Sequence, residues 1–154
     1  MSLIVVDVEA DGVIPHKYSM VCFGAVVAEP GLSKSFYGKT KPISDEWNEQ
    51  ALAISGFSRE EHLTFDEPKD VMIEFDEWIK SNSNGQATFI SDNPAFDWQW
   101  VNYYFHFFLG KNPFGFSARR IGDLYAGLEK DYFASSKWKK FRKTAHTHNP
   151  VDDA

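Results

Sequence analysis

The amino-acid sequence predicts a single α/β domain with a mixed β-sheet flanked by helices. Three apolar runs separated by turns occupy the first 40 residues, a pattern that indicates an antiparallel meander of strands. Strands and amphipathic helices then alternate along the rest of the chain, as in folds that add parallel strands to a sheet. The 154 residues, 43% of them hydrophobic, suffice for one core, and no linker divides them.

Three segments supply the strands of the meander. Residues 3–8 are apolar except for Asp7, as expected of a central strand that is buried on both faces. A turn begins at Asp11, and residues 20–28 form a second apolar run. Residues 33–37 follow another turn and form the returning strand.

Helices and two further strands follow the meander. Ser58 and Glu61 form a capping-box pattern, which predicts a short helix. Asn93 before Pro94 is typical of a helix start, with Asn as the N-cap and Pro at the first helical position. We expect helices over residues 46–54, 67–80, 93–109 and 122–129, and strands over residues 87–91 and 118–121.

Charge and cysteine content restrict the function classes. The formal net charge of −6 argues against a protein that coats long stretches of nucleic acid. Five positive charges nevertheless gather in residues 137–143, either as a solvated surface or as a phosphate-binding arm. Cys22 is the only cysteine, so no internal disulfide forms, and no apolar stretch is long enough to span a bilayer. We expect a cytoplasmic protein that does not contact membranes.

Two acidic residues on the first predicted strand are candidate metal ligands. Asp7 and Glu9 are two positions apart, so their side chains project from the same face. Carboxylates at the end of a buried strand cost free energy unless a cation neutralises them. Carboxylate oxygens are the ligands that Mg²⁺ and Mn²⁺ prefer. The alternative is that both residues lie beyond the buried part of the strand and face water.

A third acid, Asp97, lies in the first turn of the helix that follows Asn93. The helix dipole favours a carboxylate there in any protein, which is the alternative to a functional role. The helix also follows a strand, and ligands gather at the carboxyl ends of strands in α/β folds.

The end of the chain repeats this helix-start pattern. Asn149 and Pro150 predict a helix, which places Asp153 near its first turn and His148 directly before it. A histidine beside carboxylates is suited to general-base catalysis near neutral pH. A solvent-exposed histidine at a helix start is the alternative.

Together, the three motifs resemble those of the DnaQ-like DEDDh 3′–5′ exonucleases. The motifs are Asp7-Val8-Glu9, Asn93 to Asp97, and His148 to Asp153, and the resemblance covers nearly the whole chain. The small bacterial and phage exoribonucleases of the RNase T and oligoribonuclease type are the branch that the sequence resembles most. The resemblance implies a ribonuclease-H-like fold with a five-stranded sheet, in which parallel strands extend the meander.

The same resemblance implies a reaction and its cofactors. Asp7, Glu9, Asp97 and Asp153 would hold two Mg²⁺ ions, for which Mn²⁺ can substitute, and His148 would be the catalytic base. The protein would release nucleoside 5′-monophosphates from single-stranded nucleic acid with a free 3′ end. We expect RNA rather than DNA as the substrate, and a homodimer as the assembly.

Seven residues are candidates for substrate contacts. The first three follow Glu9 directly, where they would meet the scissile nucleotide. Trp98, or Trp100 in its place, would stack on a base. The last two belong to the basic cluster. The candidates are Ala10, Asp11, Gly12, Asn93, Trp98, Lys140 and Arg142.

The sequence departs from the family pattern at two places. Ala10 stands where the family commonly has Thr, so a contact made by that hydroxyl is lost. The chain ends at Ala154, where the last helix of the family normally continues, so residues 1–154 are expected to be one exonuclease domain with an incomplete C-terminal helix.

Three other functions remain open at the level of sequence. The first is a catalytically inactive nucleic-acid-binding module of the same fold. The second is a metal-dependent phosphodiesterase that acts on small nucleotides. The third is a proofreading partner of a polymerase, which predicts a large exposed apolar patch.

Overall fold

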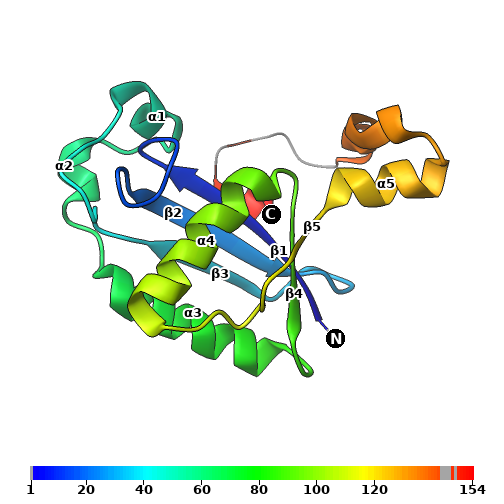
Figure 1. Cartoon of the computed structure of the whole chain (residues 1–154), viewed down its shortest axis with the longest axis horizontal. Helices are drawn as coiled ribbons and strands as arrows, with labels where there is room; N and C mark the ends of the chain where they lie inside the picture. Colours follow the sequence, from blue (N-terminus) through cyan, green and yellow to red (C-terminus); the bar gives the residue numbers. More distant parts are fainter. Residues whose placement is uncertain (1, 143–146, 148) are drawn as a thin grey trace.

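A computed structural model of the protein describes residues 2–142, 147 and 149–154. Its centre is a five-stranded sheet in the order β3-β2-β1-β4-β5 (Figure 1). The central strand β1 (Ser2–Ala10) pairs antiparallel with β2 (Met20–Val27) and parallel with β4 (Ala87–Ser91). The edge strands are β3 (Ser35–Lys39) and β5 (Ala118–Arg120). The predicted mixed sheet is therefore confirmed.

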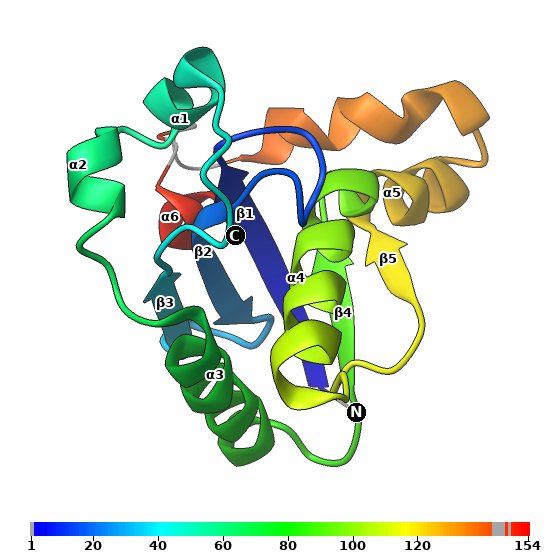
Figure 2. The ribbon, with the colours of Figure 1, turned by 60° about the vertical axis from the view of Figure 1, so that its left-hand side comes forward.

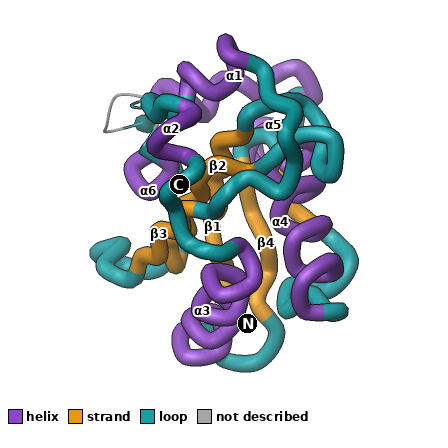
Figure 3. The backbone as a smooth tube through the Cα atoms, turned by 90° about the vertical axis from the view of Figure 1, so that its left-hand side faces the viewer, coloured by secondary structure: helices purple, strands orange, loops and turns teal. Residues whose placement is uncertain are grey.

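Helices cover the sheet unevenly. Two long helices, α3 (Pro68–Asn82) and α4 (Pro94–Leu109), lie on one face (Figure 2). The short helices α1 (Glu49–Ile54) and α2 (Arg59–His62) lie near the end of the sheet where β1 ends (Figure 3). None of the helices in the described part of the chain is long and apolar enough to cross a membrane.

The chain after β5 forms a separate projection. Helix α5 (Ile121–Glu129) and the 3₁₀ helix η1 (Tyr132–Phe141) extend away from the sheet and pack on each other (Figure 1). The last helix, α6 (Pro150–Asp153), returns to the sheet and lies against β2. The C-terminal motif is thereby brought close to the first strand, because α6 contacts both β1 and β2.

The core lies between the sheet and helices α3 and α4. On β1 the buried side chains alternate, with Ile4, Val6 and Val8 almost fully enclosed against this layer. Leu3 on the opposite face is 41% exposed. The prediction of a central strand buried on both faces is therefore wrong for its first half, because no helix of the described chain covers that part.

Most predicted boundaries hold to within a few residues, and the exceptions have local causes. The first helix begins at Glu49 rather than at residue 46, because the side chain of Asn48 accepts a hydrogen bond from the Ala51 N–H at 2.9 Å. The capping box of Ser58 and Glu61 is present. No helix was predicted for the basic segment, yet residues 132–141 form the 3₁₀ helix η1.

Candidate active site

The two carboxylates of β1, those of Asp7 and Glu9, lie on the same face of the strand, as predicted. This is the face opposite to the core. Glu9 is buried, and Asp7 is half-buried with its Oδ2 atom fully enclosed and without a hydrogen-bond partner among the described residues. Burial raises the pKa of Asp7 to about 8, and the neighbouring charges of Asp97, Glu9 and Asp153 raise it further, against the opposing effect of Arg142. An enclosed carboxylate with an unsatisfied oxygen is a group that requires a cation or a proton.

Asp97 reaches the same place from helix α4. The pairing of β1 with β4 ends at Val5 and Ile90, so the amides of β1 beyond Val5 have no partner in β4. Asp97 Oδ1 accepts a hydrogen bond from the Val8 N–H at 3.2 Å. Burial raises the pKa of Asp97 to about 7, although the Ser91 side chain and the Val8 amide oppose the shift. The carboxylate of Asp97, in the first turn of α4, therefore lies beside the part of β1 that has no partner in β4.

A glycine in β2 lets the third motif approach β1. Gly24 pairs with Asp7 across the sheet. A Cβ atom at Gly24 would lie 2.2 Å from the Pro150 carbonyl carbon, so only glycine leaves room for the backbone of α6. The Asn149 side chain caps this helix by accepting from the Val151 N–H at 3.0 Å, as predicted. Asp153 is thereby placed close enough to raise the pKa of Asp7.

The donor set fits a divalent cation, although the carboxylates are not gathered into a finished site. In residues 2–142, 147 and 149–154, no group of three or more His, Cys, Asp or Glu side chains is clustered tightly enough to hold a metal. Asp97 and Asp153 each direct an oxygen to a backbone N–H, those of Val8 and Thr147, both at 3.2 Å. The enclosed Oδ2 of Asp7 and its raised pKa are the features that a bound cation would relieve.

Two members of the predicted site cannot be placed. His148, the predicted base, and Lys143, the last residue of the basic cluster, lie outside the described residues.

The predicted contacts directly after Glu9 are occupied within the protein. Ala10, Asp11 and Gly12 are all buried. Asp11 accepts hydrogen bonds from the Ser19 N–H at 2.5 Å and from Arg59 Nη1 at 3.0 Å. A Cβ at Gly12 would fall inside the ring of Tyr18. In this structure the Asp11 carboxylate therefore stabilises the loop after β1 and is not available to a ligand.

The other predicted contacts differ in accessibility. Asn93 is exposed at the start of α4, but its side chain does not cap the helix; its backbone oxygen accepts from the Phe96 and Asp97 amides instead. Trp98 is partly buried, with its ring 5.1 Å from that of Phe89. Trp100 is fully buried, which excludes it as a stacking surface.

Two basic candidates, Lys140 in η1 and Arg142 directly after it, have defined partners. Lys140 is exposed and lies over the Phe141 ring at 5.0 Å. Arg142 lies 3.8 Å from Asp92, and it lines a cavity of about 630 Å³ together with Asp153. Arg142 is therefore next to the carboxylates, as its effect on the pKa of Asp7 also indicates.

Two further residues near the site were not predicted. Arg59 holds Asp11 and also donates to the Ser44 carbonyl at 2.9 Å. Asp92 pairs with Lys139 at 3.0 Å and accepts, through its backbone oxygen, a hydrogen bond from Arg120 Nε at 2.9 Å. These pairs join residues 15 to 48 positions apart, and no local pattern in the sequence indicates them.

Comparisons with known proteins agree with this geometry. No family model matches the chain. A 3′-5′ DNA exonuclease, Cap18 of Escherichia coli, is 44% identical over 158 residues, a match that covers 97% of this chain and 83% of the relative. The nuclease domain of 3′hExo, a DEDDh family member bound to rAMP, superposes with a TM-score of 0.78 at 16% identity, covering 99% of this chain and 85% of that one.

Two other solved structures share the fold. Cell-death related nuclease 4 has a TM-score of 0.74 at 14% identity, covering 99% of this chain and 59% of that one. The zinc-bound complex of E. coli ExoI with single-stranded DNA has a TM-score of 0.73 at 15% identity, covering 99% of this chain and 37% of that one. With the carboxylates of three motifs brought to one end of the sheet and a relative of 44% identity, the chain belongs to the DEDDh 3′–5′ exonucleases, with a ribonuclease-H-like fold.

Proposed function

We propose that the protein removes nucleoside 5′-monophosphates one at a time from the 3′ ends of single-stranded DNA, with the help of two divalent cations. The observation that carries this proposal is the enclosed, unpaired Oδ2 of Asp7 at a point where three other carboxylates raise its pKa. A nuclease that binds cations with carboxylates needs such a concentration of acids, which is unfavourable in the absence of metal.

The residues present suit Mg²⁺ or Mn²⁺, because every proposed ligand is a carboxylate. Asp7, Glu9, Asp97 and Asp153 would hold the two ions. When bound, the ions supply a positioned nucleophile and neutralise charge at the attacking and leaving oxygens of the phosphate.

The protein's own groups complete the chemistry. His148 takes the proton of the attacking water, a role that rests on its position in the third motif. Arg142, beside Asp153, is placed to contact a phosphate oxygen. Burial of Asp7 and Asp97 excludes water from one side of the site, which strengthens the attraction between each carboxylate and a cation.

We propose DNA rather than RNA as the substrate because of one relative. The relative of 44% identity is named as a DNA exonuclease. The preference for RNA expected from the sequence has no support from that relative, whereas the nuclease domain of 3′hExo was crystallised with rAMP. RNA is therefore the substrate to compare with DNA in the first experiment.

The test is digestion of a 5′-labelled single-stranded DNA and its RNA equivalent with Mg²⁺, Mn²⁺ or EDTA. We expect a metal-dependent ladder that shortens from the 3′ end and disappears in Asp97→Asn. The matched control is Asp70→Asn, since Asp70 is also an acid in the first turn of a helix that begins with proline, but it is exposed on α3. Equal losses in both variants would argue against a specific role for Asp97.

The same experiment separates the alternatives. Binding of the oligonucleotide without cleavage under any metal would indicate an inactive binding module. Turnover of a mononucleotide ester with an intact oligonucleotide would indicate a small-nucleotide phosphodiesterase. An RNA ladder without a DNA ladder would reverse the proposed substrate while leaving the reaction intact.

A further inference from the structure

Residues 119–142, which we call the α5–η1 lobe, differ in charge from the rest of the protein. The lobe contains seven Lys and Arg residues but only three Asp and Glu residues, whereas the whole chain has a net charge of −6. Its helices α5 and η1 project from the sheet (Figure 1), whereas Arg119 and Arg120 belong to β5. A positive projection on an acidic protein is the pattern expected where a polyanion is bound locally.

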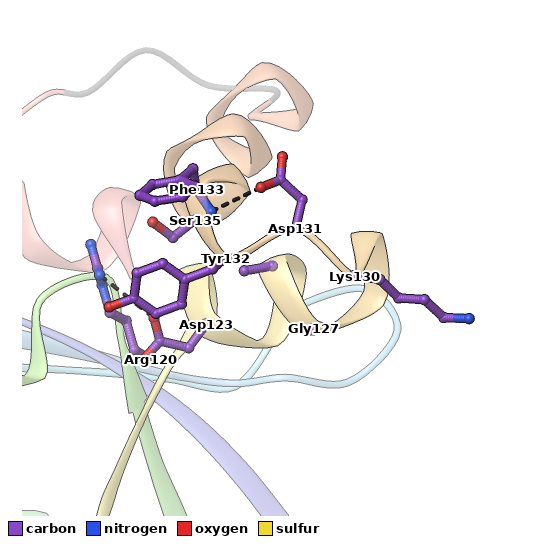
Figure 4. A pocket seen from close by; sticks show the side chains of 9 residues that line it. Arg120, Asp123, Gly127, Lys130, Asp131, Tyr132, Phe133 and Ser135 are labelled. Carbon is purple, nitrogen blue, oxygen red and sulfur yellow. Dashed lines mark hydrogen bonds and ion pairs between the residues drawn. The ribbon is translucent and has the colours of Figure 1, made fainter.

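The lobe also exposes aromatic rings. Tyr132 is 86% exposed and Phe133 is 84% exposed, and their ring centroids are 5.4 Å apart. They line a cavity of about 500 Å³ together with two basic residues, Arg120 and Lys130, and two acidic ones, Asp123 and Asp131. In Figure 4 the Tyr132 ring points back toward Arg120, and the Lys130 side chain points outward. Large rings that remain this exposed mark a site of interaction.

The backbone beneath these rings is held firmly. Asp131 caps η1, because its side chain accepts a hydrogen bond from the Phe133 N–H at 3.0 Å. A Cβ at Gly122 would lie 2.4 Å from the Ser135 carbonyl oxygen, so η1 packs directly on the start of α5. The exposed rings are therefore presented by a fixed backbone, which lowers the ordering cost of binding a ligand.

Arg120 connects this cavity with the active site. Its Nε atom donates to the Asp92 carbonyl, and Asp92 directly follows β4 and precedes the helix that carries Asp97. The Asp92 carboxylate also binds Lys139 of η1 at 3.0 Å. Arg120 and Tyr132 line one cavity, and Asp92 and Asp153 line another, so the Arg120–Asp92 hydrogen bond joins the walls of the two cavities.

We propose that the cavity of the α5–η1 lobe binds single-stranded nucleic acid upstream of the 3′ end, with bases stacked on Tyr132 and Phe133 and a phosphate contacted by Arg120. The positive charge of the lobe favours this occupant over an apolar protein surface, and aromatic stacking is the usual complement to charge in single-strand binding. The proposal rests on the proposed function, because it concerns the path of the same substrate.

The test compares long and short substrates in the full chain. Tyr132→Ala/Phe133→Ala should raise KM for a single strand of about 12 nucleotides by roughly tenfold or more, from the stacking that each base loses. Turnover of a dinucleotide should not change, since it occupies only the 3′ end. Tyr132→Phe should behave as the wild type. Phe107→Ala is the matched control, because Phe107 is 61% exposed on α4, outside the lobe.

Binding in EDTA distinguishes failure of this proposal from failure of the proposed function. Fluorescence anisotropy with the labelled 12-mer should show weaker binding by the double variant whether or not cleavage occurs. Unchanged KM and unchanged anisotropy would overturn the proposal even if cleavage is normal. A double variant that binds DNA normally but changes its sedimentation coefficient would show instead that a second copy of the chain covers the rings.

Discussion

Replacement of Gly24 by alanine tests whether the close approach of α6 to the sheet is required for activity. An alanine Cβ would lie 2.2 Å from the Pro150 carbonyl carbon, whereas ordinary contact begins at 3.4 Å. The backbone of α6 must therefore retreat by about 1.2 Å, the difference between the two distances. Neither the Pro150 carbonyl nor the strand can yield in the way that a flexible side chain would.

The expected result has a thermodynamic and a kinetic part. Overpacking at a buried contact costs about 1–3 kcal/mol of unfolding free energy. Asp153 moves with α6, and a misplacement of about 1 Å in a catalytic constellation lowers the rate by about 100-fold. We expect kcat to fall by about that factor and the metal concentration for half-maximal rate to rise, because Asp153, a proposed metal ligand, no longer reaches the other carboxylates.

Gly38→Ala supplies the control for general damage to the sheet. A Cβ at Gly38 would lie 2.6 Å from the Phe23 ring and 2.8 Å from Val71, both on the core face. This variant should lose stability in urea unfolding but keep its kcat. Wild-type kcat for Gly24→Ala at saturating Mg²⁺ would show that the contact between α6 and Gly24 does not position Asp153 for the reaction.

Three further predictions concern buried charges. Asp7→Asn should abolish cleavage in Mg²⁺, yet in EDTA at pH 8 it should raise the melting temperature by at least about 2 °C. Burial raises the pKa of Asp7 to about 8, so the native state of the wild type loses stability as pH rises from 3.8 through 8 and this carboxyl ionises. The difference in melting temperature between Asp7→Asn and the wild type should therefore vanish near pH 4. Arg59→Met should cost about 3 kcal/mol, because it leaves Asp11 buried without its cation; a loss of substrate affinity with normal stability would instead give Asp11 a role in binding. Asp76→Asn should cost about 1 kcal/mol at pH 7. Burial raises the pKa of Asp76, but hydrogen bonds from two lysines outweigh this and lower it below 3.8, so the difference from wild type should disappear as pH falls below that value in urea unfolding.

Local patterns were sufficient for the elements that carry the first two motifs. β4 has the predicted bounds, and α4 begins at Pro94 and ends at Leu109, because proline fixes the start and Gly110 adopts the left-handed conformation at the end. Period-two spacing placed Asp7 and Glu9 on one face. These features depend on neighbours within a few residues, which a sequence displays directly.

Features that depend on distant neighbours could not be predicted in this way. Asp11 looked like a substrate contact because it follows Glu9, but Arg59 approaches it from 48 residues away. Gly24 suits a strand poorly by propensity, and only the position of α6 explains it. Helix η1 packs on α5 at Gly122, a contact between residues 13 positions apart in the sequence.

The three motifs differ in how firmly the fold holds them, and this suggests an order of assembly. Asp7 and Glu9 belong to the central strand. Asp97 belongs to a helix of 16 residues, and its side chain also accepts a hydrogen bond from β1. Asp153 belongs to a helix of four residues, which has no stability of its own. Its position depends on the Asn149 cap and on the contact with Gly24. Bound cations would therefore contribute most to the placement of Asp153, whereas the other three carboxylates are already fixed by the sheet and α4.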